Sequence, residues 1–92
     1  MKIIITNAFK KAAKKLMRNQ NSIVEDVIEE IAKNPDIGDL KKGDLAGIRV
    51  YKFHIHNQLF LLAYQYSNTK IILLSLSTHE NFYRDLKKKT RA

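Results

Sequence analysis

Apolar residues recur along the first third of the chain at the spacing of amphipathic helices, after one short β-branched run. Ile3 to Ile5 predicts a strand, and it ends at Thr6 or Asn7, either of which can cap a helix. The apolar positions of the first helix lie on one face: Phe9, Ala12, Ala13, Leu16 and Met17. The other face is basic and carries Lys10, Lys11, Lys14, Lys15 and Arg18. Such a stripe is either a solvated surface or a contact for phosphate or an antagonist protein.

A second helix is predicted after the polar connector Asn19-Gln20-Asn21. Ser22 and Glu25 have the spacing of a capping box, which marks the start of a helix. The apolar positions that follow keep a helical period, at Ile23, Val24, Val27, Ile28 and Ile31. Pro35 ends the helix. Because the connector is short, we expect the two helices to pack as an antiparallel hairpin whose apolar faces cover a sheet.

The pattern changes to strands after a turn-rich segment at residues 36–47. Three apolar runs follow, at residues 48–56, 59–66 and 70–77, and they predict an antiparallel meander. Residues 78–89 begin with polar capping residues and predict a short helix. We therefore expect an α+β fold in the order β-α-α-β-β-β with a short C-terminal helix, its antiparallel sheet packed by the helical hairpin on one face.

Length and composition narrow the class of protein. The 92 residues predict a single small domain, residues 1–92, and the absence of cysteine excludes disulfides and thiolate zinc sites. The N-terminal isoleucine run is too short for a signal sequence or a membrane span, so we expect a cytoplasmic protein without membrane contacts. The net charge of +8 favours a polyanionic partner, with nucleic acid ahead of a membrane surface, although an acidic protein would suit the same field.

Histidines supply the candidate chemistry. On the strand predicted at residues 48–56, one face carries Lys52, His54 and His56. The other face carries Arg49, Tyr51, Phe53 and Ile55. The pattern leaves open which face is inward, because Ile48 and Val50 have the parity of the histidines. His79 lies where the last strand passes into the terminal helix, which is an ordinary place for a functional side chain.

The order of elements and three stretches of sequence resemble the RelE/ParE superfamily of bacterial type II toxins. Residues 48–53 (IRVYKF) and 61–65 (LLAYQ) resemble the central strands of these toxins, and residues 77–83 (STHENFY) resemble their C-terminal end. A final histidine followed four residues later by an aromatic is most similar to the YafQ type, whereas HENFYRDLK resembles a branch labelled ParE-like. The resemblance implies one of two activities. RelE, YafQ, YoeB and HigB members cleave messenger RNA in the ribosomal A site, and ParE members poison DNA gyrase.

The resemblance also implies roles for four residues. Lys52 falls at the position of a functional lysine of RelE. His54 falls at the second lysine of RelE, close to a catalytic histidine of YafQ. His79 matches the terminal catalytic histidine of YafQ, and Tyr83 matches the aromatic that follows it, near the functional tyrosine of RelE. These four are the catalytic candidates.

One position departs from the family pattern. RelE has a phosphate-stabilising arginine on its third strand, where this chain has Leu61 or Phe60. Arg49 or Arg84 would have to supply that positive charge. The candidates for contacts with RNA or its phosphates are Arg49, His56, Arg84, Lys87 and Lys88.

Two histidines suit cleavage of RNA by its own 2′-hydroxyl, which needs a base for that hydroxyl and an acid for the leaving 5′-oxygen. We expect His54 and His79 to be that pair. Lys52, Arg49 and Arg84 are the candidates for stabilising charge, and Tyr83 is expected to stack on a base or position a phosphate. This route requires no metal or cofactor. Simpler roles compete: His79 as a helix cap, His56 as a surface residue, and the three histidines together as a metal site.

The expected function is therefore that of a toxin that cleaves messenger RNA on the ribosome and is neutralised by an acidic, partly disordered antitoxin. The alternative is a ParE-type inhibitor of DNA gyrase without nuclease activity, which the unmatched arginine favours. A third interpretation is a small RNA- or DNA-binding protein without toxicity, which rests on the basic charge alone.

Overall fold

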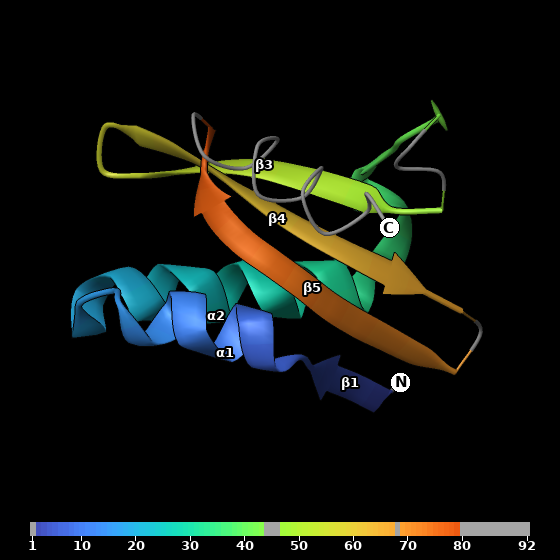
Figure 1. The fold of residues 1–92 in the computed structure, drawn as a ribbon, viewed down its shortest axis with the longest axis horizontal. Coiled ribbons are helices and arrows are strands. Elements are labelled where there is room, and N and C mark those ends of the chain that lie inside the picture. Colours follow the sequence, from blue (N-terminus) through green and yellow to red (C-terminus); the bar gives the residue numbers. More distant parts are fainter. Residues whose placement is uncertain (1, 44–46, 68, 80–92) are drawn as a thin grey trace.

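Two helices cover one face of a five-stranded sheet in the computed structural model, which describes residues 2–43, 47–67 and 69–79 (Figure 1). The elements are β1 (Lys2–Ile5), α1 (Asn7–Lys14), α2 (Arg18–Lys33), the 3₁₀ turn η1 (Pro35–Ile37), β2 (Asp39–Leu40), β3 (Arg49–Ile55), β4 (Gln58–Tyr66) and β5 (Lys70–Thr78). The strands lie side by side in the order β1-β5-β4-β3-β2. The α+β fold and the helical pair are confirmed, whereas the terminal helix predicted at residues 78–89 falls almost wholly outside the described residues.

The sheet is mixed, so the prediction of an antiparallel sheet was incomplete. β3, β4 and β5 form the antiparallel meander, but β1 pairs with β5 in parallel, with Ile3 opposite Ile71 and Ile5 opposite Leu73. The segment predicted as a loop also contributes β2, which pairs with the start of β3. Alternation along a strand reports which face is buried, but it does not report the direction of the neighbouring strand.

Helix α2 begins at Arg18, four residues before the predicted cap, so the Ser22–Glu25 capping box was wrong. The backbone N–H of Met17 donates to Oε1 of Gln20 at 2.8 Å. The side-chain amide of Asn21 donates to the carbonyls of Ala13 (3.1 Å) and Leu16 (3.4 Å) at the end of the preceding helix. The polar connector is therefore helical, and its amides satisfy backbone groups that the two helix ends leave without partners.

Thr6 joins the start of α1 to the sheet. Its hydroxyl accepts from the backbone N–H of Phe9 at 3.3 Å and donates to the carbonyl of Leu73 at 2.8 Å. The cap predicted at Thr6 or Asn7 is thus on Thr6. This contact sets the helices over the sheet face that carries the larger core, formed by Phe9, Val24, Val27, Ile31, Phe53, Ile55, Phe60, Leu62, Tyr64, Ile71, Leu73 and Leu76.

A bulge in β5 resets which of its residues face the helices. Ala63 pairs with Ser75 but the next residue, Tyr64, pairs with Leu73, so Leu74 is the extra residue. Leu73 and Leu76 consequently both reach the helix-side core, although strict alternation would place them on opposite faces. The same shift places Ser75 on the face turned away from the helices.

The turn between β3 and β4 consists of His56 and Asn57, one residue earlier than the predicted Asn57-Gln58. His56 has a φ of +56°, which makes it the one non-glycine residue with positive φ in the described part of the chain. A side chain at positive φ brings its Cβ close to the following carbonyl, and glycine avoids that contact.

We expect His56→Gly to raise the free energy of unfolding by about 0.5–1 kcal/mol, because relief of the strained turn outweighs the added freedom of the unfolded chain. Urea unfolding followed by circular dichroism measures the change. Asn57→Gly is the matched control in the same turn and should leave stability unchanged or lower it. Equal effects of the two substitutions would show that the turn at His56 is not strained.

Candidate functional site on the far face of the sheet

The structure decides which face of β3 is inward. Phe53 and Ile55 pack into the core under the helices, so Lys52 and His54 point to the opposite face, and both are exposed. We call this opposite side of the sheet, turned away from α1 and α2, the far face. The question that the hydrophobic pattern left open is thereby settled by the position of the helical layer.

Strand pairing brings three of the predicted site residues to one end of the sheet. Lys52 pairs with Leu61, which pairs with Ser77, so the β3 and β5 backbones lie about 10 Å apart across β4. One row further along, His54 pairs with Leu59. His79 directly follows β5, whose last residue pairs with the neighbour of Leu59. Lys52, His54 and His79 therefore lie at the end of the sheet that carries the β3–β4 turn.

A shallow hollow of about 340 Å³ lies at this end and is lined by Asn57, Gln58, Leu59, Thr78 and His79. His79 is exposed, as is His54. The hollow offers an apolar floor at Leu59 with amide, hydroxyl and imidazole groups around it. Such a mixture suits a polar ligand that carries a flat or apolar part.

Two serine hydroxyls lie further along the far face. The Oγ atoms of Ser75 and Ser77 are buried, and neither has a hydrogen-bond partner within the described residues. Ser77 lies in the same row as Lys52. A second apolar cluster lies beside them on this face, formed by Ile48, Val50, Leu61 and Ala63 with Leu74 packed against it. The far face thus combines an apolar centre with polar groups at its edges.

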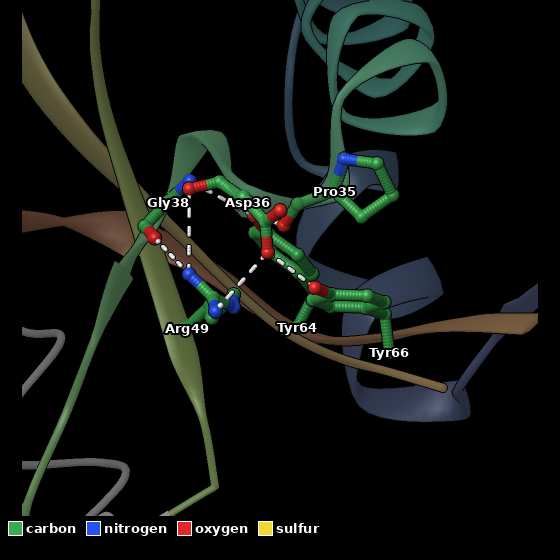
Figure 2. A network of polar contacts seen from close by, with 6 residues as sticks. All are labelled: Pro35, Asp36, Gly38, Arg49, Tyr64 and Tyr66. Carbon is green, nitrogen blue, oxygen red and sulfur yellow. Dashed lines mark hydrogen bonds and ion pairs between the residues drawn. The ribbon is translucent and has the colours of Figure 1, made fainter. Parts of the chain in front are cut away.

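Arg49, a predicted phosphate contact, lies on the other side of the sheet from Lys52 and His54. Its guanidinium donates to the carbonyl of Gly38 at 2.9 Å and that of Asp36 at 3.3 Å, and it pairs with the carboxylate of Asp36 at 3.3 Å (Figure 2). The side chain is 20% exposed. These contacts hold η1 and the start of β2 against the sheet.

Two tyrosines of β4 complete this network, which we call the η1 latch: Asp36, Gly38, Arg49, Tyr64 and Tyr66, with the carbonyl of Pro35. The hydroxyl of Tyr64 donates to the carbonyl of Pro35 at 2.6 Å and accepts from the N–H of Gly38 at 2.9 Å. Tyr66 is hydrogen-bonded to the carboxylate of Asp36, and the Arg49 guanidinium lies 5.3 Å from its ring centre (Figure 2).

The latch explains why residue 38 is a glycine. A Cβ atom at that position would lie 2.8 Å from the Tyr64 hydroxyl oxygen, which is closer than two such atoms can approach. The sequence predicted Tyr64 and Tyr66 only as packing aromatics. Their polar contacts have no local signal, because Tyr64 and Gly38 are 26 residues apart in the chain.

Burial is the main cause that raises the pKa of Tyr64 above its usual value, and the N–H of Gly38 opposes this by lowering it. The pKa of Tyr66 is raised chiefly by its hydrogen bond to Asp36. For Tyr51, burial and then a hydrogen bond to Glu30 raise the pKa. All three phenols therefore hold their protons more firmly in the folded chain than in the unfolded one.

Several predicted site residues are placed elsewhere or fall outside the described residues. His56 lies in the β3–β4 turn rather than on the strand, so it is not in line with Lys52 and His54. Within the described residues, no three side chains of histidine or acidic residues lie close enough together to hold a metal ion. The candidates outside the described residues are Tyr83, Arg84, Lys87 and Lys88. No helix in the described part of the chain is both long and apolar enough to cross a membrane.

The sequence of residues 3–87 matches the family of ParE-like toxins of type II bacterial toxin-antitoxin systems. The chain belongs to this family. The match includes every described helix and strand except for Lys2, the first residue of β1. The toxin has no match among curated proteins.

Solved structures show where else this fold occurs. The toxin resembles a chain of the RelBE2 toxin-antitoxin complex from Mycobacterium tuberculosis, with a TM-score of 0.67 and 18% identity over 85% of this chain and 96% of that one. A mutant of Escherichia coli RelE in the free state has a TM-score of 0.69 and 15% identity over 95% of both chains. A conserved hypothetical protein from Helicobacter pylori is 28% identical, with a TM-score of 0.54, and the similarity covers 87% of this chain and 96% of that one. At these identities the two toxin structures show a shared fold.

We expect Tyr64→Phe to lower the free energy of unfolding of the toxin by about 1–3 kcal/mol, because it leaves the buried N–H of Gly38 without an acceptor. Tyr66→Phe is the matched control on the same strand and removes a more exposed hydroxyl, so its effect should be smaller. Urea unfolding of both variants tests this. Equal losses would show that burial of the Tyr64 hydroxyl does not decide its contribution.

The raised pKa values of the tyrosines predict a loss of stability at alkaline pH. A phenol with a higher pKa in the folded state stabilises the fold fully below the unfolded value of about 10, and that contribution disappears as pH rises through the folded value. Between pH 9 and 11, unfolding free energies should therefore fall less for Tyr64→Phe than for the unsubstituted toxin. The two proteins differ only at residue 64, so the difference between their curves isolates the tyrosine, and parallel curves would contradict the raised pKa.

Proposed function

We propose that this toxin is a ribosome-dependent messenger-RNA endonuclease whose cleavage site lies on the far face beside the β3–β4 turn. The observation that supports the proposal is the convergence of Lys52, His54 and His79 at one end of the sheet, from segments that are far apart in the sequence. A surface that only binds nucleic acid has no need of two imidazoles there.

The spacing of the two histidines suits the reaction. His54 lies on β3 opposite Leu59, and His79 follows the end of β5 on the other side of β4, where the β3 and β5 backbones are about 10 Å apart. A phosphate above Leu59 would lie between the two imidazoles. One imidazole accepts the proton of the 2′-hydroxyl as its oxygen attacks phosphorus, and the other, protonated, donates a proton to the 5′-oxygen as its bond to phosphorus breaks.

Lys52 supplies positive charge in this mechanism. It is exposed on the same face, one row from His54, and its ammonium can approach the negative charge that develops on the phosphate oxygens. Arg49 lies on the opposite face and is held by the η1 latch, which favours Lys52 over Arg49 for this role.

An antitoxin is the second partner in the proposal. The lysines of α1 at positions 10, 11 and 14 are exposed, and within the described residues none of them forms an ion pair with an acidic side chain. An acidic antitoxin segment would complement that surface. The structural relative from Mycobacterium tuberculosis was itself solved as a toxin-antitoxin complex.

Inhibition of DNA gyrase is the second candidate function. The family that matches the sequence is described as ParE-like. The described part of the chain has arginines only at positions 18 and 49, and neither is on the far face. Within the described residues the far face therefore has no arginine to stabilise a phosphate, which favours this alternative. On this alternative, His54 and His79 have no catalytic role.

Cell-free translation with the purified toxin tests the proposal, with cuts in a defined message mapped by primer extension. We expect cuts only with translating ribosomes, and His54→Ala and His79→Ala should each reduce the cleavage rate by about 10²–10⁴-fold. Lys33→Gln, in the last turn of α2, is the control and should cleave at the normal rate. Circular dichroism checks that each variant is folded.

A gyrase supercoiling assay runs in parallel with the same proteins. Cleavage that survives both histidine substitutions would show that the catalytic assignment is wrong. An intact message, together with supercoiling that is blocked equally by the toxin and its histidine variants, would identify a gyrase inhibitor instead.

A further inference from the structure

A second hollow lies at the other end of the far face. It has a volume of about 270 Å³ and is lined by Gly47, Gln65, Tyr66, Ser67, Lys70 and Ile72. Gln65 follows Leu59, Leu61 and Ala63 at alternate positions on β4, so it lies on the same face as the proposed cleavage site. Leu59 and Gln65 are six residue steps apart, which corresponds to about 20 Å along the strand. We call this feature the Gln65 hollow.

The groups at the Gln65 hollow suit a nucleotide. The Gln65 amide offers both donors and an acceptor, which can match the edge of a base, and the half-buried side chain of Ile72 provides an apolar surface. Gly47 has no side chain and a φ of +84°, and a Cβ built there would meet nothing within 4 Å. Within the described residues, no side chain of Gly47 or atom near its Cβ position narrows the hollow.

Two lysines stand together beside this hollow. Lys70, which lines it, is the register partner of Lys2 on β1, and both are exposed. Like charges on directly opposed residues repel each other. Within the described residues no acidic side chain pairs with either lysine. A bound phosphate would offset this repulsion.

We propose that the Gln65 hollow binds one nucleotide of a single-stranded RNA that extends along the far face from the cleavage site. Gln65 contacts the base edge, and Lys70 with Lys2 contacts the adjoining phosphate. This inference rests on the proposed endonuclease function, because it assigns the hollow to a flanking part of the same substrate. It adds a positioning and base-selecting site distant from the reacting phosphate.

Equilibrium binding of the full-length toxin to fluorescent single-stranded RNA tests the inference, with oligomers of increasing length and of each base. Affinity should rise in a step once the strand is long enough to reach both hollows. Gln65→Met keeps the length of the side chain but removes the amide, and it should cost about fivefold or more for the preferred base only. Lys70→Gln should weaken binding of the longer oligomers of every sequence.

The salt dependence separates the two contributions. Lys70→Gln should reduce the slope of log affinity against log salt by about 0.7, the value for one phosphate contact on a single strand, whereas Gln65→Met should leave it unchanged. Lys33→Gln on the helical layer is the charge-matched control, and Lys52→Gln reports binding at the cleavage site.

The outcomes separate this inference from the function on which it rests. If Lys52→Gln weakens RNA binding but Gln65→Met and Lys70→Gln do not, the inference is overturned while the cleavage site stands. If none of the variants changes RNA binding, both lose their support. If the hollow variants weaken binding of an acidic peptide and leave RNA binding intact, the hollow serves a protein partner and the inference is again overturned.

Discussion

The position of each candidate side chain on β3 depends on the packing of one sheet face against α1 and α2. Side chains alternate along a strand, so burial of Phe53 and Ile55 under the helices sends Lys52 and His54 to the other side. The hydroxyl of Thr6 fixes the helical layer by bonding to β5. A helical layer on the opposite face would have buried Lys52 and His54 and exposed the core. The candidate chemistry of this toxin is therefore a consequence of where its helices pack.

The bulge in β5 adds a second constraint. Without an extra residue at Leu74, Leu73 and Leu76 could not both enter the helix-side core. The shift also turns Ser75 and Ser77 to the far face, in line with the row that contains Lys52. Packing on the helix side of the sheet thereby determines which polar side chains of β5 face the other side.

The η1 latch accounts for an arginine that charge alone would assign to phosphate. Arg49 is a cation in a basic chain, as expected of an RNA contact. Its guanidinium, however, is hydrogen-bonded to Gly38 and paired with Asp36 on the helix side of the sheet. Strand parity was the available clue, since it groups Arg49 with Tyr51, Phe53 and Ile55 rather than with Lys52. A charged residue in a basic protein can thus have a structural role.

The sequence by itself determined the local features of this protein: two amphipathic helices, the three-stranded meander, a helix cap at Thr6 or Asn7, and the family resemblance. These depend on residues close together in the chain, where helical and strand periods are directly visible. Tertiary structure decided the parallel pairing of β1 with β5, the start of α2 and the inward face of β3. It also decided the η1 latch and the two hollows. Apart from the start of α2, which depends on contacts within the helical pair, each of these features joins residues far apart in the chain. Local pattern carries no record of which distant segments will pack together.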